Sequence, residues 1–160
     1  MSSIVTPDRF TRALKKNPTI LKSILRGVTH EEARQARDEG PDGWNVIEVL
    51  CHLRDFDAVF MERAWAMVEQ DRPAMQPVDH LQMVIERRYA EQQFETVLAE
   101  YLAHRAEFNA WVAALTDDDW GRVGVHPVNG EVTLLEQIVQ ASDHDTNHFE
   151  QIARILGHGA

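Results

Sequence analysis

Apolar residues recur every three or four positions in four separate segments of this chain, and that spacing limits what the chain can fold into. Because an α-helix has about 3.6 residues per turn, such spacing gathers the apolar side chains on one face. The segments span about residues 6–27, 45–70, 78–115 and 133–156, and only residues 122–125 suit a short extended strand. The sequence therefore predicts an all-α protein, an up-down four-helix bundle with short accessory helical turns.

Local signals refine the ends of these predicted helices. Thr29 with Glu32 and Thr133 with Glu136 have the spacing of a capping box, in which a threonine and a glutamate three residues later satisfy the first free N–H groups of a helix. A break is expected at Asn17-Pro18, because proline interrupts the hydrogen bonding of a helix interior.

Length and composition indicate one soluble domain. The chain has 160 residues, of which 44% are hydrophobic, and this is enough to bury one core, so residues 1–160 are predicted to form a single four-helix-bundle domain. A single cysteine, Cys51, excludes a disulfide within the chain and suits a reducing compartment. No apolar run is long enough for a membrane span. A cytoplasmic location is expected.

The charge of the chain is strongly negative and unevenly distributed. A formal net charge of −10 argues against a nucleic-acid-binding surface, which needs clustered Lys and Arg. The N-terminal helical segment, about residues 1–27, is nevertheless basic. Such a segment can act as a transit peptide or bind an anionic surface, but a solvated helix face is the favoured interpretation. Its basic residues are Arg9, Arg12, Lys15, Lys16, Lys22 and Arg26.

Two histidines, His144 and His148, stand four residues apart in the last predicted helix. Four residues advance a helix by one turn plus about 40°, so both imidazoles leave the same face with Cβ atoms about 5–6 Å apart. That separation suits one divalent ion at nitrogen distances of about 2.0–2.1 Å. His148 aligns with the apolar Ile152 and Ile155 and should point inward, whereas His144 should lie at the edge of the core.

A third histidine, His52, lies within the second predicted helix, one residue from its apolar stripe. Taken alone, such a residue is more often hydrogen-bonded at a helix interface than a metal ligand. Together with His144 and His148 it would complete three protein ligands and leave one coordination position open.

The other histidines carry less weight. Solvated positions are expected for His30, His80, His104 and His158, and His126 is expected to hold a loop or border a pocket.

Several common catalytic motifs are absent from the sequence. The residues between His144 and His148 do not form the His-Glu-x-x-His motif of metalloproteases, and Asp145 should point about 100° away from His144. There is also no glycine-rich phosphate loop and no serine or cysteine nucleophile elbow. No catalytic residue can be assigned from the sequence.

Three blocks of the sequence together resemble the DinB/YfiT-like superfamily of four-helix-bundle metalloenzymes. Residues 43–53 contain a tryptophan, a polar cap and a His-Leu pair, and residues 126–136 contain His-Pro, Gly and Thr-Leu before the last helix. Residues 144–152 contain His-x-x-x-His followed by Gln-Ile. The resemblance extends over about residues 43–156, and the order of the blocks is more specific than any one of them.

The resemblance implies that His52, His144 and His148 bind a divalent metal ion, which in this superfamily is nickel, zinc, iron or manganese. It also implies a homodimer. Some members of the superfamily are thiol-dependent S-transferases or isomerases that use bacillithiol, mycothiol or glutathione. A low-molecular-weight thiol or another small molecule is therefore the expected partner.

Three functional hypotheses follow. The first is a divalent-metal-dependent enzyme of the DinB family, a thiol S-transferase or a hydrolase, in which the ion acts as a Lewis acid. The second is a non-catalytic metal- or small-molecule-binding protein of the stress response, and the third is a helical interaction domain with core histidines. Glu48 is a candidate hydrogen-bond partner for an imidazole or else a surface acid. Core packing is favoured over pocket lining for Trp44 and Trp120.

Overall fold

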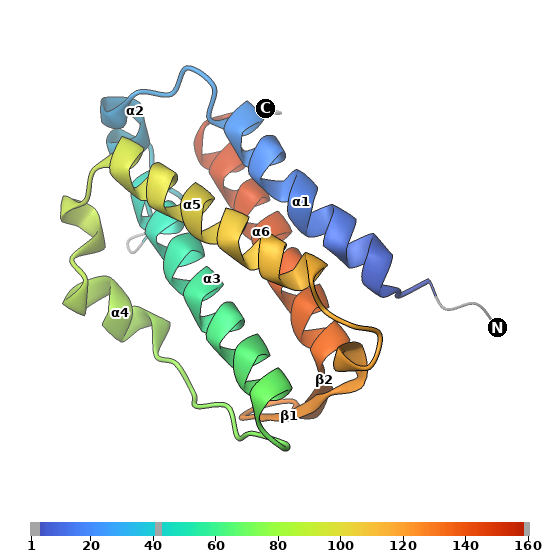
Figure 1. Cartoon of the computed structure of the whole chain (residues 1–160). Helices are drawn as coiled ribbons and strands as arrows, with labels where there is room; N and C mark the ends of the chain where they lie inside the picture. Colours follow the sequence, from blue (N-terminus) through green and yellow to red (C-terminus); the bar gives the residue numbers. More distant parts are fainter. Residues whose placement is uncertain (1–3, 41–42, 159–160) are drawn as a thin grey trace.

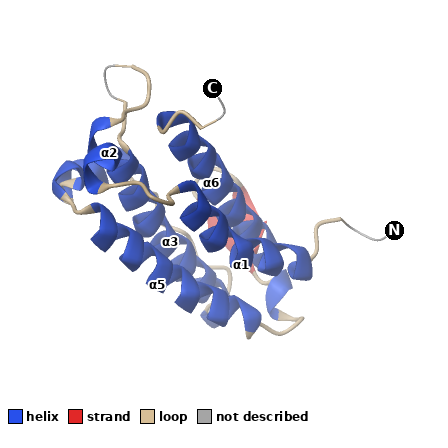
Figure 2. Cartoon of the chain, turned by 90° about the horizontal axis from the view of Figure 1, so that it is seen from above, coloured by secondary structure: helices blue, strands red, loops and turns tan. Residues whose placement is uncertain are grey.

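Four long helices form the body of the molecule in a computed structural model that describes residues 4–40 and 43–158 (Figure 1). These are α1 Pro7–Ile24, α3 Val46–Glu69, α5 Phe94–Ala113 and α6 Leu134–Ile155. The shorter elements are helices α2 His30–Gln35 and α4 His80–Glu86, 3₁₀ turns η1 Tyr89–Glu91 and η2 Asp119–Gly121, and strands β1 Val123–His126 and β2 Gly130–Thr133. Figure 2 shows that most of the described chain is helical.

The path of the chain through the bundle has one distinctive step. Both α1 and α3 pack mainly against α5 and α6, so α1 and α3 lie diagonally opposite. Helices α3 and α5 run in the same direction, since Asp57 bonds to Arg105 and Trp65 contacts Trp111. Residues 70–93, which include α4, carry the chain back between them (Figure 1). The predicted four-helix bundle is confirmed, and its path departs from simple up-down alternation at this step.

Capping boxes begin three of the helices. Those predicted at Thr29 and Thr133 are confirmed. A third, in which Asn45 accepts from the backbone N–H of Glu48 and Glu48 accepts from the backbone N–H of Asn45, begins α3. It fixes the start of the helix that carries His52, because both reciprocal bonds are buried.

Two expected helix boundaries are wrong. Helix α1 continues through Pro18, whose ring removes the N–H that would bond to the carbonyl of Leu14. The side-chain amide of Asn109 on α5 donates to that carbonyl instead, at 3.2 Å, so tertiary contact replaces the lost bond. The single helix expected over residues 78–115 is divided, because the chain turns at Arg88, which has a left-handed φ of 50°.

The expected short strand at residues 122–125 corresponds to β1. It pairs antiparallel with β2, whose extended conformation was not predicted, and His126 lies opposite Gly130. Met75 in the connector after α3 donates its backbone N–H to Val125, which ties that connector to the hairpin. The hairpin therefore holds His126 beside Arg63 of α3 and near the middle of α6.

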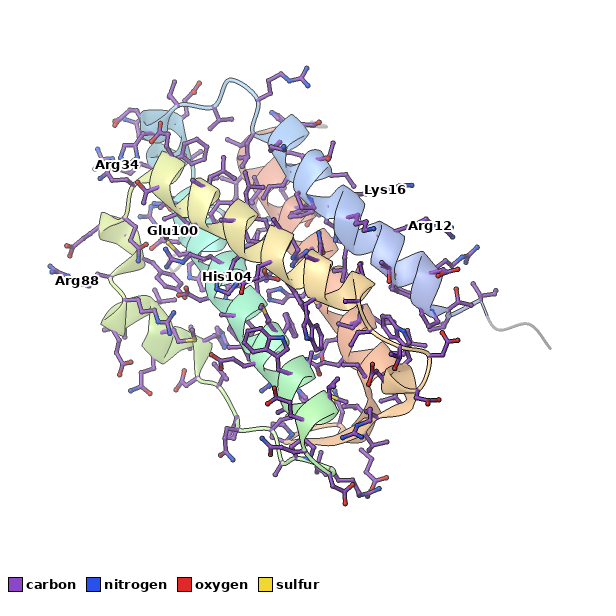
Figure 3. The ribbon with its side chains drawn as sticks, in the orientation of Figure 1. Arg12, Lys16, Arg34, Arg88, Glu100 and His104 are labelled. Carbon is purple, nitrogen blue, oxygen red and sulfur yellow. The ribbon has the colours of Figure 1, made fainter. Side chains whose placement is uncertain are left out.

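The basic face of α1 is directed to solvent. Leu14, Asn17 and Leu21 form the buried side of this helix, while Arg12 and Lys16 are exposed and point away from the bundle (Figure 3). This arrangement agrees with the favoured interpretation of a solvated face. Among the described residues, no helix is both long and apolar enough to cross a membrane.

A buried ion cluster joins all four long helices. The guanidinium of Arg105 on α5, only 1% exposed, bonds to Asp57 on α3 at 2.5 Å and 2.9 Å. It also bonds to Asp145 on α6, at 2.9 Å to one of its oxygens. Asn17 on α1 donates to Asp145 at 2.8 Å. Burial raises the pKa of Asp57 above its usual range, although the Arg105 charge acts in the opposite direction.

We expect Arg105→Leu to destabilise the protein strongly. The substitution leaves the carboxyl groups of Asp57 and Asp145 buried without their cation, and breaking a buried pair in this way costs about 3–5 kcal/mol. The free energy of unfolding, measured by urea denaturation, should fall by that amount. Arg12→Leu, on the exposed face of α1, is the control and should change it by less than about 0.5 kcal/mol. A loss below about 1 kcal/mol for Arg105→Leu would contradict this role of the cluster.

Candidate metal centre

Three histidines from two helices meet at one point in the bundle. His52 extends from α3, and His144 and His148 extend from consecutive turns of α6. One side-chain nitrogen from each lies within 4.8 Å of the other two, and the Nε2 atoms of His52 and His144 are 2.9 Å apart. Nitrogens placed tetrahedrally at about 2.0–2.1 Å from an ion are about 3.3 Å from one another. The cluster is thus close to the spacing that a small divalent ion requires.

Aromatic packing holds His52 and His144 in position. The ring of His52 lies 5.2 Å from Trp44 and 4.4 Å from Phe56, between ring centroids. Phe56 also stacks on His144 at 5.3 Å, with 20° between the ring planes, and Phe60 contacts His144 edge-on. Trp44 therefore borders the site. The sequence had favoured a role in core packing for this residue. Trp120 packs in the other part of the core.

Hydrogen bonding assigns the tautomer of His148. Its Nδ1 lies 2.8 Å from Oε1 of Gln151, and Nε2 of that glutamine donates to Asp38 at 3.0 Å. Arg154 also bonds to Asp38. Because the amide nitrogen faces a carboxylate, the amide oxygen must face the imidazole, and Nδ1 of His148 donates to it. The lone pair of His148 Nε2 is left for the cluster, as a metal ligand requires.

Burial keeps the three imidazoles neutral. Loss of solvation, followed by the neighbouring imidazoles, lowers the pKa of His52 to about 2. Burial and then His148 lower the pKa of His144 to about 3. Burial also lowers the pKa of His148, while its bond to Gln151 acts in the opposite direction. Neutral imidazole is the form that coordinates a metal ion, so the protonation state suits the geometry.

The donor set therefore fits a divalent cation. Two Nε2 atoms point at each other at 2.9 Å, a contact in which two unprotonated lone pairs would repel unless a proton or a cation lies between them. His52 also has a buried Nδ1 without a hydrogen-bond partner among the described residues, so no protein group there determines which of its nitrogens carries the proton. Three imidazoles match the ligand preference of zinc, nickel and iron.

Two other acids near the site have structural roles. Asp145 points away from the histidines, as expected, into the ion cluster of Arg105. Glu48, considered from the sequence as a partner for an imidazole or as a surface acid, is neither. Its carboxylate is buried and accepts from the Asn45 backbone and from Arg37. The Cys51 thiol is also buried, and burial raises its pKa to about 12, which makes it unreactive.

A cavity of about 430 Å³ opens beside the cluster. Its wall includes His144, Phe56 and Phe60. His126 and Arg63 also line this cavity. His80, which was expected to be solvated, is exposed and also borders this cavity. A volume of this size is typical of sites for small molecules.

The three histidines are recognisable from the sequence, but the residues that orient them are not. Arg105 and Asp38 have no motif around them, and their partners are distant in the sequence. Asp57, which interrupts the apolar stripe of its helix, was the one visible signal of a buried cation such as Arg105. For Gln151 the signal was the Gln-Ile pair after His148.

A helical bundle with a three-histidine cluster beside a cavity defines a class of candidate metalloproteins, and comparison with known proteins gives the family. The model of the DinB superfamily matches residues 13–152, and the chain belongs to this superfamily. The resemblance noted in the sequence is thereby confirmed.

Two relatives come from Bacillus subtilis (strain 168). The chain is 25% identical to "Putative metal-dependent hydrolase YfiT" over 156 residues, covering 94% of this chain and 85% of YfiT. It is 26% identical to "Uncharacterized protein YuaE" over 144 residues, covering 82% of this chain and 87% of YuaE.

Two solved structures share the fold. The structure of YfiT has a TM-score of 0.79 at 24% identity and covers 98% of this chain and 91% of YfiT. It is described as having an unusual four-helix bundle topology. The mycothiol-dependent maleylpyruvate isomerase has a TM-score of 0.76 at 10% identity, and the match covers 92% of this chain and 60% of the isomerase. The present chain thus spans about three fifths of that enzyme.

We expect Gln151→Leu to let His148 change between its two tautomers. The substitution removes the acceptor of the Nδ1–H, so the fraction of the Nδ1–H tautomer should fall, as measured by long-range ¹H–¹⁵N correlation in metal-free protein. Affinity for Zn²⁺ should fall about 10–100-fold, since partners of ligating imidazoles have effects of this size. Gln82→Leu makes the same change on the exposed helix α4 and is the control. An unchanged tautomer would show that Gln151 does not orient His148.

Proposed function

We propose that the chain is a divalent-metal-dependent enzyme whose ion is held by His52, His144 and His148. The observation that supports this most directly is the meeting of three neutral imidazoles beside a cavity large enough for a small molecule. The relationship to the protein named "Putative metal-dependent hydrolase YfiT" points the same way. Which ion is bound, nickel, zinc, iron or manganese, is left open, since three imidazoles do not select one of them.

The protein residues would divide the work as follows. His52, His144 and His148 would occupy three ligand positions and leave the side toward the cavity free. A divalent ion bound there supplies Lewis acidity, which lowers the pKa of a coordinated water or thiol. Gln151 would hold the His148 tautomer, and Phe56 and Phe60 would exclude water from the inner wall of the cavity.

Two reaction classes share this chemistry and differ in the nucleophile. Hydrolysis, in which the nucleophile is water, follows the name of YfiT. Transfer of a low-molecular-weight thiol follows the mycothiol-dependent isomerase, whose likeness is one of fold alone. Within the proposal, a cavity beside the cluster favours an enzyme over the alternative of a metal-binding stress-response protein without activity. A cytoplasmic homodimer is part of the same proposal.

The proposal is tested by metal content. Untagged protein, loaded with Zn²⁺ and passed through a desalting column, should retain about one ion per chain by mass spectrometry of the metal. His148→Ala and His52→Ala should each lose it, because two imidazoles bind a divalent ion far more weakly than three. His158→Ala, at the exposed end of the described chain, is the control and should bind like the parent. Retention of one ion by both variants would contradict the assigned ligands.

Catalysis needs a second readout on the same loaded samples. Activated esters and amides are offered with water alone, and electrophiles such as epoxides are offered with bacillithiol, mycothiol or glutathione. Turnover that disappears in His148→Ala and persists in His158→Ala would assign the reaction class. If no loaded sample turned over any of these substrates, the non-catalytic alternative would replace the enzyme.

A further inference from the structure

An arginine without an acidic partner faces the cavity beside the histidine cluster. Arg63 on α3 is half-buried, and its Nη2 donates to the backbone oxygen of Gln76 at 2.8 Å. No carboxylate of residues 4–40 and 43–158 forms an ion pair with it, and burial alone lowers its pKa. The bond to Gln76 uses one of the five N–H groups of the guanidinium. A largely uncompensated cation therefore lies in the cavity wall.

The neighbouring imidazole of His126 is a hydrogen-bond donor toward the same point. Its Nδ1 accepts from the backbone N–H groups of Val128 and Asn129, each at 3.2 Å. Since both of those groups are donors, Nδ1 must carry the lone pair, and the proton of the neutral ring is on Nε2. Burial and then the Arg63 charge lower the pKa of His126, which favours this neutral form.

Two donors thus face each other across a short gap. Nη1 of Arg63 lies 3.4 Å from Nε2 of His126, and both atoms carry hydrogen. Neither can accept from the other, so this contact is not a hydrogen bond in the tautomer that Val128 and Asn129 impose. An acceptor placed beside the pair would satisfy both donors. A carboxylate has two oxygens at a suitable separation, and it is one of the two anions, with phosphate, whose geometry the planar guanidinium matches.

We propose that Arg63 and His126 form a carboxylate-binding subsite, and that the small molecule accepted by the cavity is an organic monoacid. One cation lies at the subsite, and Asp143 in the same cavity wall disfavours a multiply charged anion. The assignment of the reacting end of that molecule to the histidine cluster rests on the proposed function; the subsite itself does not.

The apolar wall between the subsite and the cluster suggests the shape of the ligand. His52, Phe56, Phe60 and Arg63 follow one another at intervals of four, four and three residues, so they share one face of α3. Eleven residues extend about 16 Å along a helix axis, and the long arginine side chain shortens that span. A molecule with a carboxylate at Arg63, an apolar middle against the two phenylalanines and its reactive group near His144 fits a cavity of about 430 Å³.

The subsite is tested first on metal-free protein, with hexanoate and 1-hexanol as probes of equal chain length. Hexanoate should bind roughly 10-fold more tightly or better, because charge-assisted hydrogen bonds contribute that much. Addition of hexanoate should shift the ¹⁵N–¹H NMR signal of the Arg63 Nε–H group. Arg63→Met should remove the preference for hexanoate, Arg63→Lys should keep part of it, and Arg26→Met, at an exposed position, should keep all of it.

Equal affinity for the two probes, or a preference that survives in Arg63→Met, would overturn the subsite. The direct signal from Arg63 in the unsubstituted protein decides the matter even if Arg63→Met folds poorly. Failure of the metal proposal is seen separately, because it appears as absent metal with an intact preference for hexanoate. Failure of the subsite appears as retained metal without that preference.

Discussion

The guanidinium of Arg105 lies at the centre of the bundle and connects a side chain from each of its long helices. It comes from α5, binds Asp57 of α3 and Asp145 of α6, and reaches Asn17 of α1 through Asp145. Burying three charged groups is costly, so the cluster is stable only when these partners meet in one arrangement. We infer that this requirement sets how far each helix is rotated about its axis.

The histidine cluster depends on that rotation. Asp145 follows His144 directly in α6, and positions that are adjacent in a helix point about 100° apart. With Asp145 directed at Arg105, the face of α6 that carries His144 and His148 turns toward α3 and His52. The buried ion cluster and the candidate metal centre are therefore two sides of the same helix, and a change in one should be felt in the other.

Much of this structure follows from local sequence patterns, and the remainder depends on contacts between distant segments. Apolar periodicity predicts the long helices, and the spacing of Thr133 and Glu136 predicts where α6 begins. By contrast, an amide from α5 replaces the bond that α1 loses at Pro18, and no local pattern predicts the left-handed turn at Arg88. The same division applies to the site. His144 and His148 are visible as a pair, whereas the link from His148 through Gln151 to Asp38 appears only after folding.

The proposed metal centre requires that three imidazoles from α3 and α6 share one ion. X-ray absorption at the zinc edge, on protein loaded with one equivalent of Zn²⁺, tests it most directly. We expect three imidazole nitrogens at about 2.0–2.1 Å and one further light atom at the open position. His52→Ala, which binds the ion too weakly to keep it through desalting, is measured with the one equivalent of Zn²⁺ left in the sample and should show no more than two imidazoles. A spectrum with two or fewer imidazoles in the unsubstituted protein, or one that His52→Ala leaves unchanged, would show that the three histidines do not share one ion.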